Sequence, residues 1–283
     1  MSRTPLFDHL VDDAAVFPPG DAALEVAVSE HLQRRDGSDA AHLGPLLLRA
    51  ADAAGVARLA VADDRTEKRP LEVALVVRPG SPVSLLTDGV VVLSREPRVH
   101  VVAVELGWSP GWRSALALDL PVVVEVARGP EQKSALDDIA TAVDENATVL
   151  AKFRTGATPE WPWPDETALA EFLDATILRG LAFKLTGGLH HAVRGDHEGG
   201  AQHGLLNVIL ATHEALDGAE AHELAEILGN RNAEVLTERV SRLTAVEAAR
   251  ARGSLTAFGC CGVLDPLTEL EALGLIPCEG RTS

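Results

Sequence analysis

The feature that most constrains this chain is a repeated alternation between short β-branched runs and longer Ala- and Leu-rich segments with helical spacing. Such alternation predicts βα units arranged around a parallel sheet. Eight parallel strands are the number that closes a barrel, so the sequence predicts a single-domain (β/α)8 TIM barrel over residues 1–283. The eight predicted strands are residues 15–17, 46–48, 73–77, 101–104, 122–124, 149–151, 181–183 and 255–258.

Two of the predicted crossover helices have clear apolar periodicity. Residues 135–143 and 169–177 both place apolar side chains at helical spacing. The second helix is expected to begin at Pro164-Asp165-Glu166 and to stop at Gly180. The region 80–98 is compatible with either a helix or a strand.

The connection between the seventh and eighth predicted strands is about seventy residues long, which exceeds an ordinary loop plus one helix. We expect a helical insertion over residues 190–252 that caps the active-site face of the barrel. Its expected elements are a helix over 202–216 and two further helical stretches that continue through Arg252.

Charge and composition exclude several classes of protein. Acidic residues outnumber basic ones by 42 to 25, which gives a net charge of −17 and disfavours binding to the phosphates of nucleic acids. Every apolar stretch is too short to span a membrane, and residues 1–5 lack the core of a signal peptide. We therefore predict a cytoplasmic protein that binds neither nucleic acid nor membrane. An odd number of cysteines argues against a disulfide framework. The sequence is compatible with a homo-oligomer.

Charged residues follow the predicted strands of the second half of the chain. In a parallel barrel the carboxyl ends of the strands meet on one face, and active sites form there. We therefore expect the active site at this rim. The residues that end the predicted strands are Glu105 for the fourth, Glu125 for the fifth, Lys152 and Arg154 for the sixth, Lys184 for the seventh, and Gly259-Cys260-Cys261 for the eighth.

The two strand-end lysines are the first candidates for catalysis. Strand alternation puts Lys152 on the opposite side from Phe153, so both lysines point into the barrel if the phenylalanines face the helices. Mutual repulsion and desolvation would then lower the pKa of one lysine until it is a neutral amine. Such an amine forms a Schiff base with a carbonyl compound and assists cleavage of carbon–carbon bonds. The alternative is a solvated lysine, or an ion pair with Glu105 or Glu125.

Two short segments carry a family resemblance. Lys152-Phe-Arg-Thr155-Gly156 and Lys184-Leu-Thr-Gly187-Gly188-Leu189 resemble the K-x-x-T-G and K-x-x-G-G-I motifs of deoxyribose-phosphate aldolase and its class I aldolase relatives. The resemblance implies that Lys152 is the Schiff-base lysine, that Lys184 lowers its pKa, and that the backbone of Gly187 and Gly188 binds an anion. Further similar segments are Asp8-His9, Val124-Glu125 and Phe258-Gly259-Cys260-Cys261.

The chain also departs from that family. Val-Glu105-Leu stands where the family has an E-x-D pattern, so Glu105 and Glu125 are both candidates for relaying protons. Cys260 and Cys261 stand in place of phosphate-binding serines, which puts a phosphorylated substrate in doubt. The long segment after the seventh strand is foreign to the family. The segments Phe17-Pro-Pro and Gly188-Leu-His-His are similar to an uncharacterised bacterial barrel family, which implies no function.

Four of the ten histidines lie within fourteen residues directly after the seventh strand. Imidazole is a favoured ligand of zinc, and Asp196, Glu105 or Glu125 could complete a coordination shell, although the spacing matches no standard motif. This pattern supports a metal-dependent site as an alternative. The four residues are His190, His191, His197 and His203.

The same segment offers residues for proton transfer and substrate binding. At least one of His190, His191 and His203 is a candidate for acid–base or substrate-binding duty. His203 and Asn207 share one helix face at i, i+4. Arg194, like Arg154, could bind a carboxylate or phosphate through both arms of its guanidinium. The alternative is that these are loop histidines and solvated salt bridges.

The sequence thus favours a lyase or aldolase-like enzyme that needs no cofactor and uses Lys152 on a small anionic carbonyl substrate. The first alternative is a metal-dependent lyase, isomerase or hydrolase with a divalent ion at the histidines of 190–203. The second is a non-catalytic barrel that binds an anionic metabolite. Cys260-Cys261 is interpreted as a packing pair, because a nucleophilic thiolate would need a nearby histidine that sequence cannot place.

Overall fold

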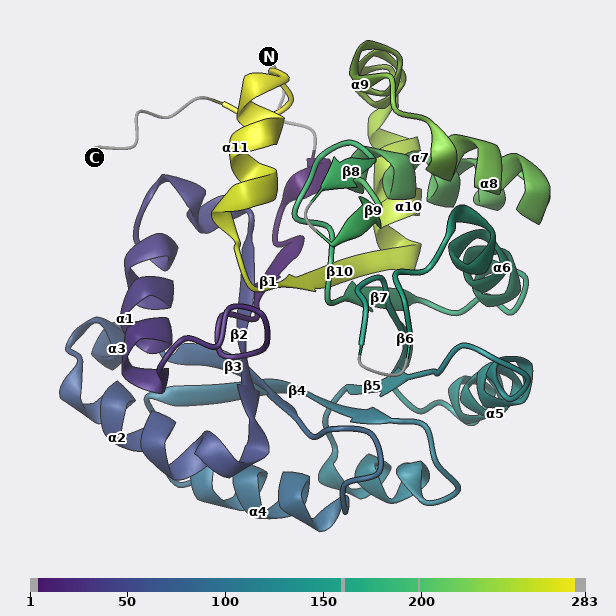
Figure 1. The fold of residues 1–283 in the computed structure, drawn as a ribbon. Coiled ribbons are helices and arrows are strands. Elements are labelled where there is room, and N and C mark those ends of the chain that lie inside the picture. Colours follow the sequence, from purple (N-terminus) through teal and green to yellow (C-terminus); the bar gives the residue numbers. More distant parts are fainter. Residues whose placement is uncertain (1–4, 159–160, 198, 278–283) are drawn as a thin grey trace.

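The computed structural model describes residues 5–158, 161–197 and 199–277 and contains a closed barrel of eight parallel strands (Figure 1). The strands are ordered β1-β10-β7-β6-β5-β4-β3-β2, and β1 closes the ring by pairing with both β2 and β10. The predicted (β/α)8 barrel is confirmed. Its strands are β1 (Val11–Asp13), β2 (Leu43–Arg49), β3 (Leu71–Val76), β4 (Val99–Gly107), β5 (Val122–Glu125), β6 (Val149–Arg154), β7 (Phe183–Thr186) and β10 (Leu255–Cys260).

Helices surround the ring of strands (Figure 1). The region 80–98, for which the sequence allowed either structure, contains the helix α4. None of the helices in the described ranges combines the length and the apolar character that crossing a membrane requires. The helices of this layer outside the β7–β10 connection are α1 (Leu24–Arg35), α2 (Ala53–Ala62), α3 (Arg65–Lys68), α4 (Ser84–Leu93), α5 (Gln132–Asp144), α6 (Glu166–Ile177) and α11 (Leu264–Ala272).

The helix α6 begins and ends where the sequence indicates. The Asp165 carboxylate accepts a hydrogen bond of 2.8 Å from the backbone N–H of Ala168, which satisfies one of the free donors of the first turn. Gly180 has a φ of 64°, a left-handed conformation that allows the chain to leave the helix and turn toward β7.

An aromatic cluster joins α6 to the two strands that carry the lysines. The ring of Phe172 stacks on Phe153 with the centroids 4.7 Å apart and meets the edge of Phe183 at 5.7 Å. All three rings are fully buried. Because strand side chains alternate, phenylalanines that face α6 oblige Lys152 and Lys184 to point into the barrel.

The first strand lies earlier than the sequence predicts. The predicted strand 15–17 is wrong, because residues 14–22 form a loop in which Phe17 N–H bonds Ala14 O and Ala22 N–H bonds Ala15 O. The true strand contains Asp12 and Asp13, a residue type that is depleted in strands. Both carboxylates are buried here and have partners in the fold, which is what makes the strand possible.

The connection from β7 to β10 contains a small hairpin and four helices, where the sequence suggested three. Its elements are β8 (Gly195–His197), β9 (Gly200–Gln202), α7 (Leu205–Leu216), α8 (Ala221–Gly229), α9 (Ala233–Ser241) and α10 (Ala245–Ser254). Both α7 and α8 pack on α6, and α10 packs on α7. The role of this segment as a cap on the active-site face stays a prediction.

The aromatic cluster gives a test of the core. We expect Phe172→Ala to lower the free energy of unfolding by about 3–5 kcal/mol, because it removes the ring that joins α6 to β6 and β7 and leaves a cavity. Leu178→Ala at the end of the same helix, where the side chain is 76% exposed, should change it by less than about 0.5 kcal/mol. Urea denaturation of both variants measures the difference, and equal losses would contradict the packing described here.

Candidate active site

Six charged side chains form an alternating chain inside the carboxyl end of the barrel. Lys184 contacts both Asp12 and Glu105. Lys152 Nζ lies 2.8 Å from Glu105 Oε2 and 3.0 Å from Glu125 Oε2. Arg154 Nε donates to Glu125 Oε1 at 3.0 Å. Acidic and basic groups are equal in number, so the formal charges of the six groups cancel. The charge network, as we call it, is Asp12, Lys184, Glu105, Lys152, Glu125 and Arg154.

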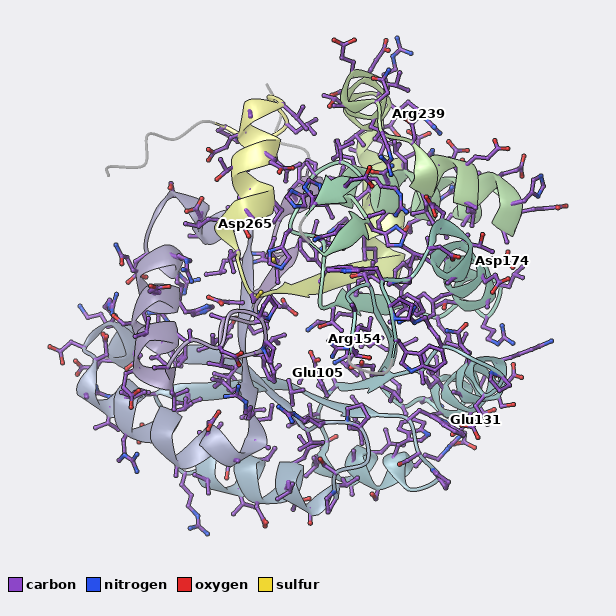
Figure 2. All side chains as sticks on the ribbon, viewed as in Figure 1. Glu105, Glu131, Arg154, Asp174, Arg239 and Asp265 are labelled. Atoms are coloured by element: carbon purple, nitrogen blue, oxygen red, sulfur yellow. The ribbon has the colours of Figure 1, made fainter. Side chains whose placement is uncertain are left out.

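The strand register explains why these residues meet. Lys152 is paired with Lys184 across β6 and β7, and Glu125 is paired with Lys152 across β5 and β6. Glu105 reaches the two lysines from β4, at the far side of β5. Figure 2 shows Glu105 and Arg154 within the ring of strands, whereas Glu131 lies at the periphery. The predicted strand-end residues of β4 to β7 are therefore brought together.

The expected lowering of the lysine pKa is wrong. Only 3% of Lys152 and 4% of Lys184 is exposed, and this burial alone would lower the pKa of an amine. The carboxylates outweigh burial: Glu105 and Glu125 raise the pKa of Lys152, and Asp12 and Glu105 raise that of Lys184. The sequence argument considered repulsion between two ammonium groups, but a carboxylate lies between them.

The carboxyl groups of the network differ in their proton affinity. Burial by itself raises the pKa of Glu105, yet its two lysine partners lower the pKa to about 2. Burial raises the pKa of Asp12, and Lys184, which Asp12 shares with Glu105, does not lower it enough to offset burial. Asp12 is thus the carboxyl group of the network that most readily holds a proton. Sequence reasoning missed it because the first strand was placed too late.

Two glycine turns follow the lysine strands and pack backbone to backbone. A Cβ on Gly156 would lie 1.7 Å from Gly187 O, and a Cβ on Gly188 would lie 2.7 Å from Thr155 Oγ1. Gly187 has a left-handed φ of 74°. A Cβ there would lie 2.8 Å from an Arg154 guanidinium nitrogen, so that cation lies against the turn. The structure thus brings Arg154, Gly187 and Gly188 together, and their binding of an anion stays a prediction.

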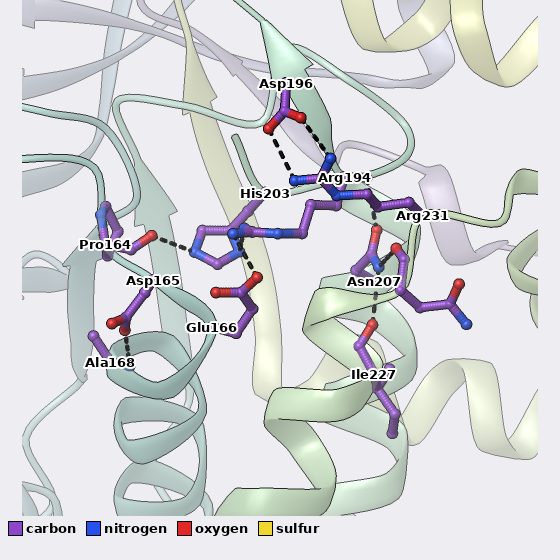
Figure 3. Close-up of polar contacts among 11 residues, drawn as sticks. Pro164, Asp165, Glu166, Ala168, Arg194, Asp196, His203, Asn207, Ile227 and Arg231 are labelled. Atoms are coloured by element: carbon purple, nitrogen blue, oxygen red, sulfur yellow. Dashed lines mark hydrogen bonds and ion pairs between the residues drawn. The ribbon is translucent and has the colours of Figure 1, made fainter. Parts of the chain in front are cut away.

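Three other predicted binding residues form a second, buried cluster (Figure 3). Arg194 pairs with Glu166 at 2.7 Å and contacts His203 Nδ1 at 3.0 Å, while His203 Nε2 donates to Pro164 O at 3.0 Å. Asn207 Oδ1 accepts from the backbone N–H of Arg194 at 3.0 Å. Within the described ranges no hydrogen bond or ion pair joins this Arg194–His203–Asn207 cluster to the charge network.

This second cluster connects secondary-structure elements. Asn207 Nδ2 donates to the carbonyl groups of Ile227 and Asn230 at the end of α8. His203 is 1% exposed, and burial together with the Arg194 cation lowers its pKa to about 4. A neutral ring fits its place as acceptor from Arg194 and donor to Pro164 O. The cluster therefore joins α6, α7 and α8, and a role in substrate binding stays a prediction.

The remaining histidines of the segment lie in separate surroundings. His191 stacks on His197 with ring centroids 3.3 Å apart, and its Nδ1 lies 2.8 Å from Glu269. His190 lies among Cys260, Cys261 and Asp265 instead. Among the residues that the structure describes, no group of three or more His, Cys, Asp or Glu side chains is arranged to hold a metal ion. The metal-dependent alternative stays untested.

The other segments of the aldolase resemblance lie at different ends of the barrel. Asp8-His9 precedes β1, and His9 Nδ1 contacts Leu43 O at the start of β2. Val124-Glu125 ends β5 beside the lysines, and Cys260-Cys261 ends β10. A comparison with known protein families matched no family model, and a comparison with curated proteins gave no match.

Because of the charge network, we expect the free energy of unfolding to depend on pH in the acid range. Glu105→Gln should lower the free energy of unfolding at neutral pH by about 3–5 kcal/mol, because two buried ammonium groups lose their shared carboxylate. In the wild type the Glu105 pKa is about 2 when folded against 4.5 in the free side chain. Its contribution is therefore complete above pH 4.5 and is lost as the pH falls toward 2. Urea denaturation across this range measures it, with the exposed Glu131→Gln as control.

The outcome that would contradict this assignment is a Glu105→Gln variant that keeps both the neutral-pH stability and the acid dependence of the wild type. Glu131 is exposed just before α5, so its variant should match the wild type throughout.

A second pH dependence should arise from His203 at milder acidity. Its pKa is about 4 when folded and 6.5 when free, so the unfolded chain binds a proton first as the pH falls between these values. The free energy of unfolding should therefore decrease by on the order of 3 kcal/mol between pH 6.5 and 4. His203→Gln should flatten this slope, whereas His222→Gln at an exposed position should not. Thermal melts at half-unit pH steps test it.

Proposed function

We propose that this protein is a small-molecule enzyme of the lyase or aldolase type that acts through a Schiff base on Lys152. The observation that carries the proposal is the pairing of Lys152 with Lys184 on adjacent strands, both in contact with the Glu105 carboxylate, at the end of a barrel where catalytic groups gather. A (β/α)8 barrel is compatible with such an enzyme, although the fold alone does not specify the reaction.

The cost of burying these charges supports a functional role. Barrel interiors are ordinarily filled with branched apolar side chains. Replacing a buried ion pair by packed apolar groups is often neutral or stabilising, because each ion loses its hydration. A network of six charged groups is therefore a poor way to fill a barrel for stability alone. Selection for chemistry accounts for its presence at the carboxyl end.

The resting state defines what the reaction must do first. Lys152 is held as an ammonium, so its Nζ must transfer a proton to Glu105 or Glu125, which lie 2.8 and 3.0 Å away. The free amine then attacks the substrate carbonyl carbon. The carbonyl oxygen leaves as water after it takes up two protons, and the imine accepts the electron pair of the cleaved carbon–carbon bond.

The second lysine and its partners suit proton transfer around the imine. Lys184 contacts both Glu105 and Asp12, so Glu105 connects the two ammonium groups. Asp12, with its raised pKa, can hold the proton that the leaving fragment requires. In this proposal Lys184 keeps a positive charge beside the imine, and Glu105 passes protons between the two lysines.

The surroundings of the network indicate the substrate class. Arg154 lies against the Gly187 turn and offers a guanidinium that is 37% exposed at the mouth. The opposite wall is apolar and small, because Leu47, Ala74 and Ala14 form a separate cluster inside the barrel. A short carbonyl compound with a carboxylate or phosphate at one end fits both features.

One observation favours the non-catalytic alternative. Both lysines are fully paired and hold raised pKa values, so the network could act as a sensor that opens when an anionic metabolite competes for Arg154 or Lys152. A barrel of this kind would be stabilised by the ligand without turning it over.

Borohydride reduction tests the proposed Schiff base. The native protein is incubated with small aldehydes, ketones and 2-oxo acids, reduced, and examined by intact mass and peptide mapping. We expect a stable adduct on Lys152 that is lost in Lys152→Ala and slowed in Lys184→Ala. Lys133→Ala, at an exposed position on α5, is the matched control and should trap normally. Thermal stabilisation by these compounds without any adduct would contradict the proposed enzyme and favour the non-catalytic binding barrel.

The pH dependence of trapping tests the electrostatics separately. Because the carboxylates raise the pKa of Lys152, the fraction of free amine increases with pH through the alkaline range. The trapping rate should therefore rise from neutral pH to at least pH 9 and show no plateau near 7. A rate that is already maximal at neutral pH would contradict the raised lysine pKa.

A further inference from the structure

The end of β10 carries a thiol, an imidazole and a carboxylate in series. Cys261 Sγ lies 3.4 Å from His190 Nε2, and His190 Nδ1 lies 2.8 Å from Asp265 Oδ2. The three residues come from different segments: the loop after β10, the loop after β7 and the first turn of α11. A base that contacts a nucleophile through one nitrogen and an orienting acid through the other is the arrangement that activates Ser and Cys nucleophiles.

The two adjacent cysteines lie in different surroundings. Cys260 is 1% exposed within the apolar core, and its Sγ lies 3.3 Å from Gly262 O. Burial raises the pKa of the Cys260 thiol and keeps it protonated. Cys261 is only partly buried and follows Gly259, which is paired with Asp12 inside the barrel. Continued strand alternation therefore places Cys261 on the inner side of the barrel wall, opposite to Cys260.

The backbone around the triad leaves room for it. A Cβ on Gly262 would lie 2.1 Å from Asp265 Oδ2, so only glycine there lets the Asp265 carboxylate fold back toward His190. Leu189, directly before His190, has a left-handed φ of 59°, which is uncommon outside glycine and fixes the direction of the chain. Both features fit a positioned imidazole.

The electrostatics agree with this geometry. Hydrogen bonds that the protonated ring donates to the sulfur atoms of Cys260 and Cys261, followed by the contact with Asp265, raise the pKa of His190 to about 11. The charged and titratable groups in contact with the ring are these three side chains. An imidazole with this pKa is protonated at neutral pH, so His190 is the group that holds the proton of the site.

We propose that Cys261, His190 and Asp265 form a nucleophilic thiol site that accepts acyl groups from small activated esters or thioesters. His190 holds the proton of the Cys261 thiol on Nε2, and Cys261 Sγ bonds to the acyl carbon as the thiolate. The bond to the leaving alcohol or thiol breaks, and that group takes the proton from His190. Water then hydrolyses the acyl-enzyme and returns the thiol. Asp265 is a positioning residue that holds the ring. This activity is additional to the Schiff-base chemistry and does not depend on it.

Acylation by p-nitrophenyl acetate tests the site on the full chain. We expect a burst of p-nitrophenolate and an acetyl group on the peptide that contains residues 260 and 261, lost in Cys261→Ala and retained in Cys260→Ala. Cleavage after glutamate separates Cys278, which lies outside the described residues, because Glu269 and Glu271 stand between it and Cys261. A thioester on a cysteine and a reduced imine on a lysine are separate products, so failure of one proposal is distinguishable from failure of the other.

Variants of the other two residues separate a triad from an ordinary thiol. His190→Ala and His190→Gln should each slow acylation of Cys261 by about 10²-fold, the usual contribution of a general base. Asp265→Asn should slow it less and shift its pH profile. In the His190 variants the rate should rise about tenfold per pH unit, as for an unassisted thiol. Circular dichroism checks that each variant is folded.

Two results would overturn the proposal: equal acylation of Cys260 and Cys261, or acylation of Cys261 at the wild-type rate in a folded His190 variant. Either result would indicate that Cys260 and Cys261 serve only in packing.

Discussion

The interaction on which the site depends is the Glu105 carboxylate held between Lys152 and Lys184. Two buried ammonium groups on neighbouring strands would repel each other strongly in a medium of low polarity. A single carboxylate from β4 removes that repulsion, and Glu125 and Asp12 balance the remaining charge. The strand order makes this possible, because β1 and β4 lie on either side of the lysine strands β7 and β6, each separated from them by one strand.

This electrostatic balance governs the chemistry that the barrel can perform. A lysine surrounded by cations would rest as a free amine, whereas these lysines rest as ammonium groups. In the proposed reaction, the nucleophile is therefore produced when substrate enters and a proton shifts to a carboxylate. In that proposal an anionic substrate competes with Glu125 for Arg154 and releases the Glu125 carboxylate to accept the proton. Binding and activation would then be one event.

The segment after β7 divides its histidines among three environments. His203 is a neutral, buried connector, His191 stacks on His197, and His190 reaches the thiol of Cys261. Residues that look like one cluster in the sequence are separated because the chain makes a hairpin between them. The carboxyl end of the barrel consequently holds buried ammonium groups on β6 and β7, and a partly buried thiol follows the end of β10.

The sequence alone determined the barrel, the register that turns Lys152 and Lys184 inward, and the helix α6, because these depend on local periodicity and on side-chain alternation. It misplaced β1, since adjacent aspartates conceal a strand whose stability comes from distant partners. The sign of the lysine pKa shifts and the pairing of Cys261 with His190 were decided only in the tertiary structure. Glu105 and Lys184 are 79 positions apart and His190 and Cys261 are 71 apart. Local patterns carry no information on such contacts, and electrostatic energies depend on the distances that folding alone sets.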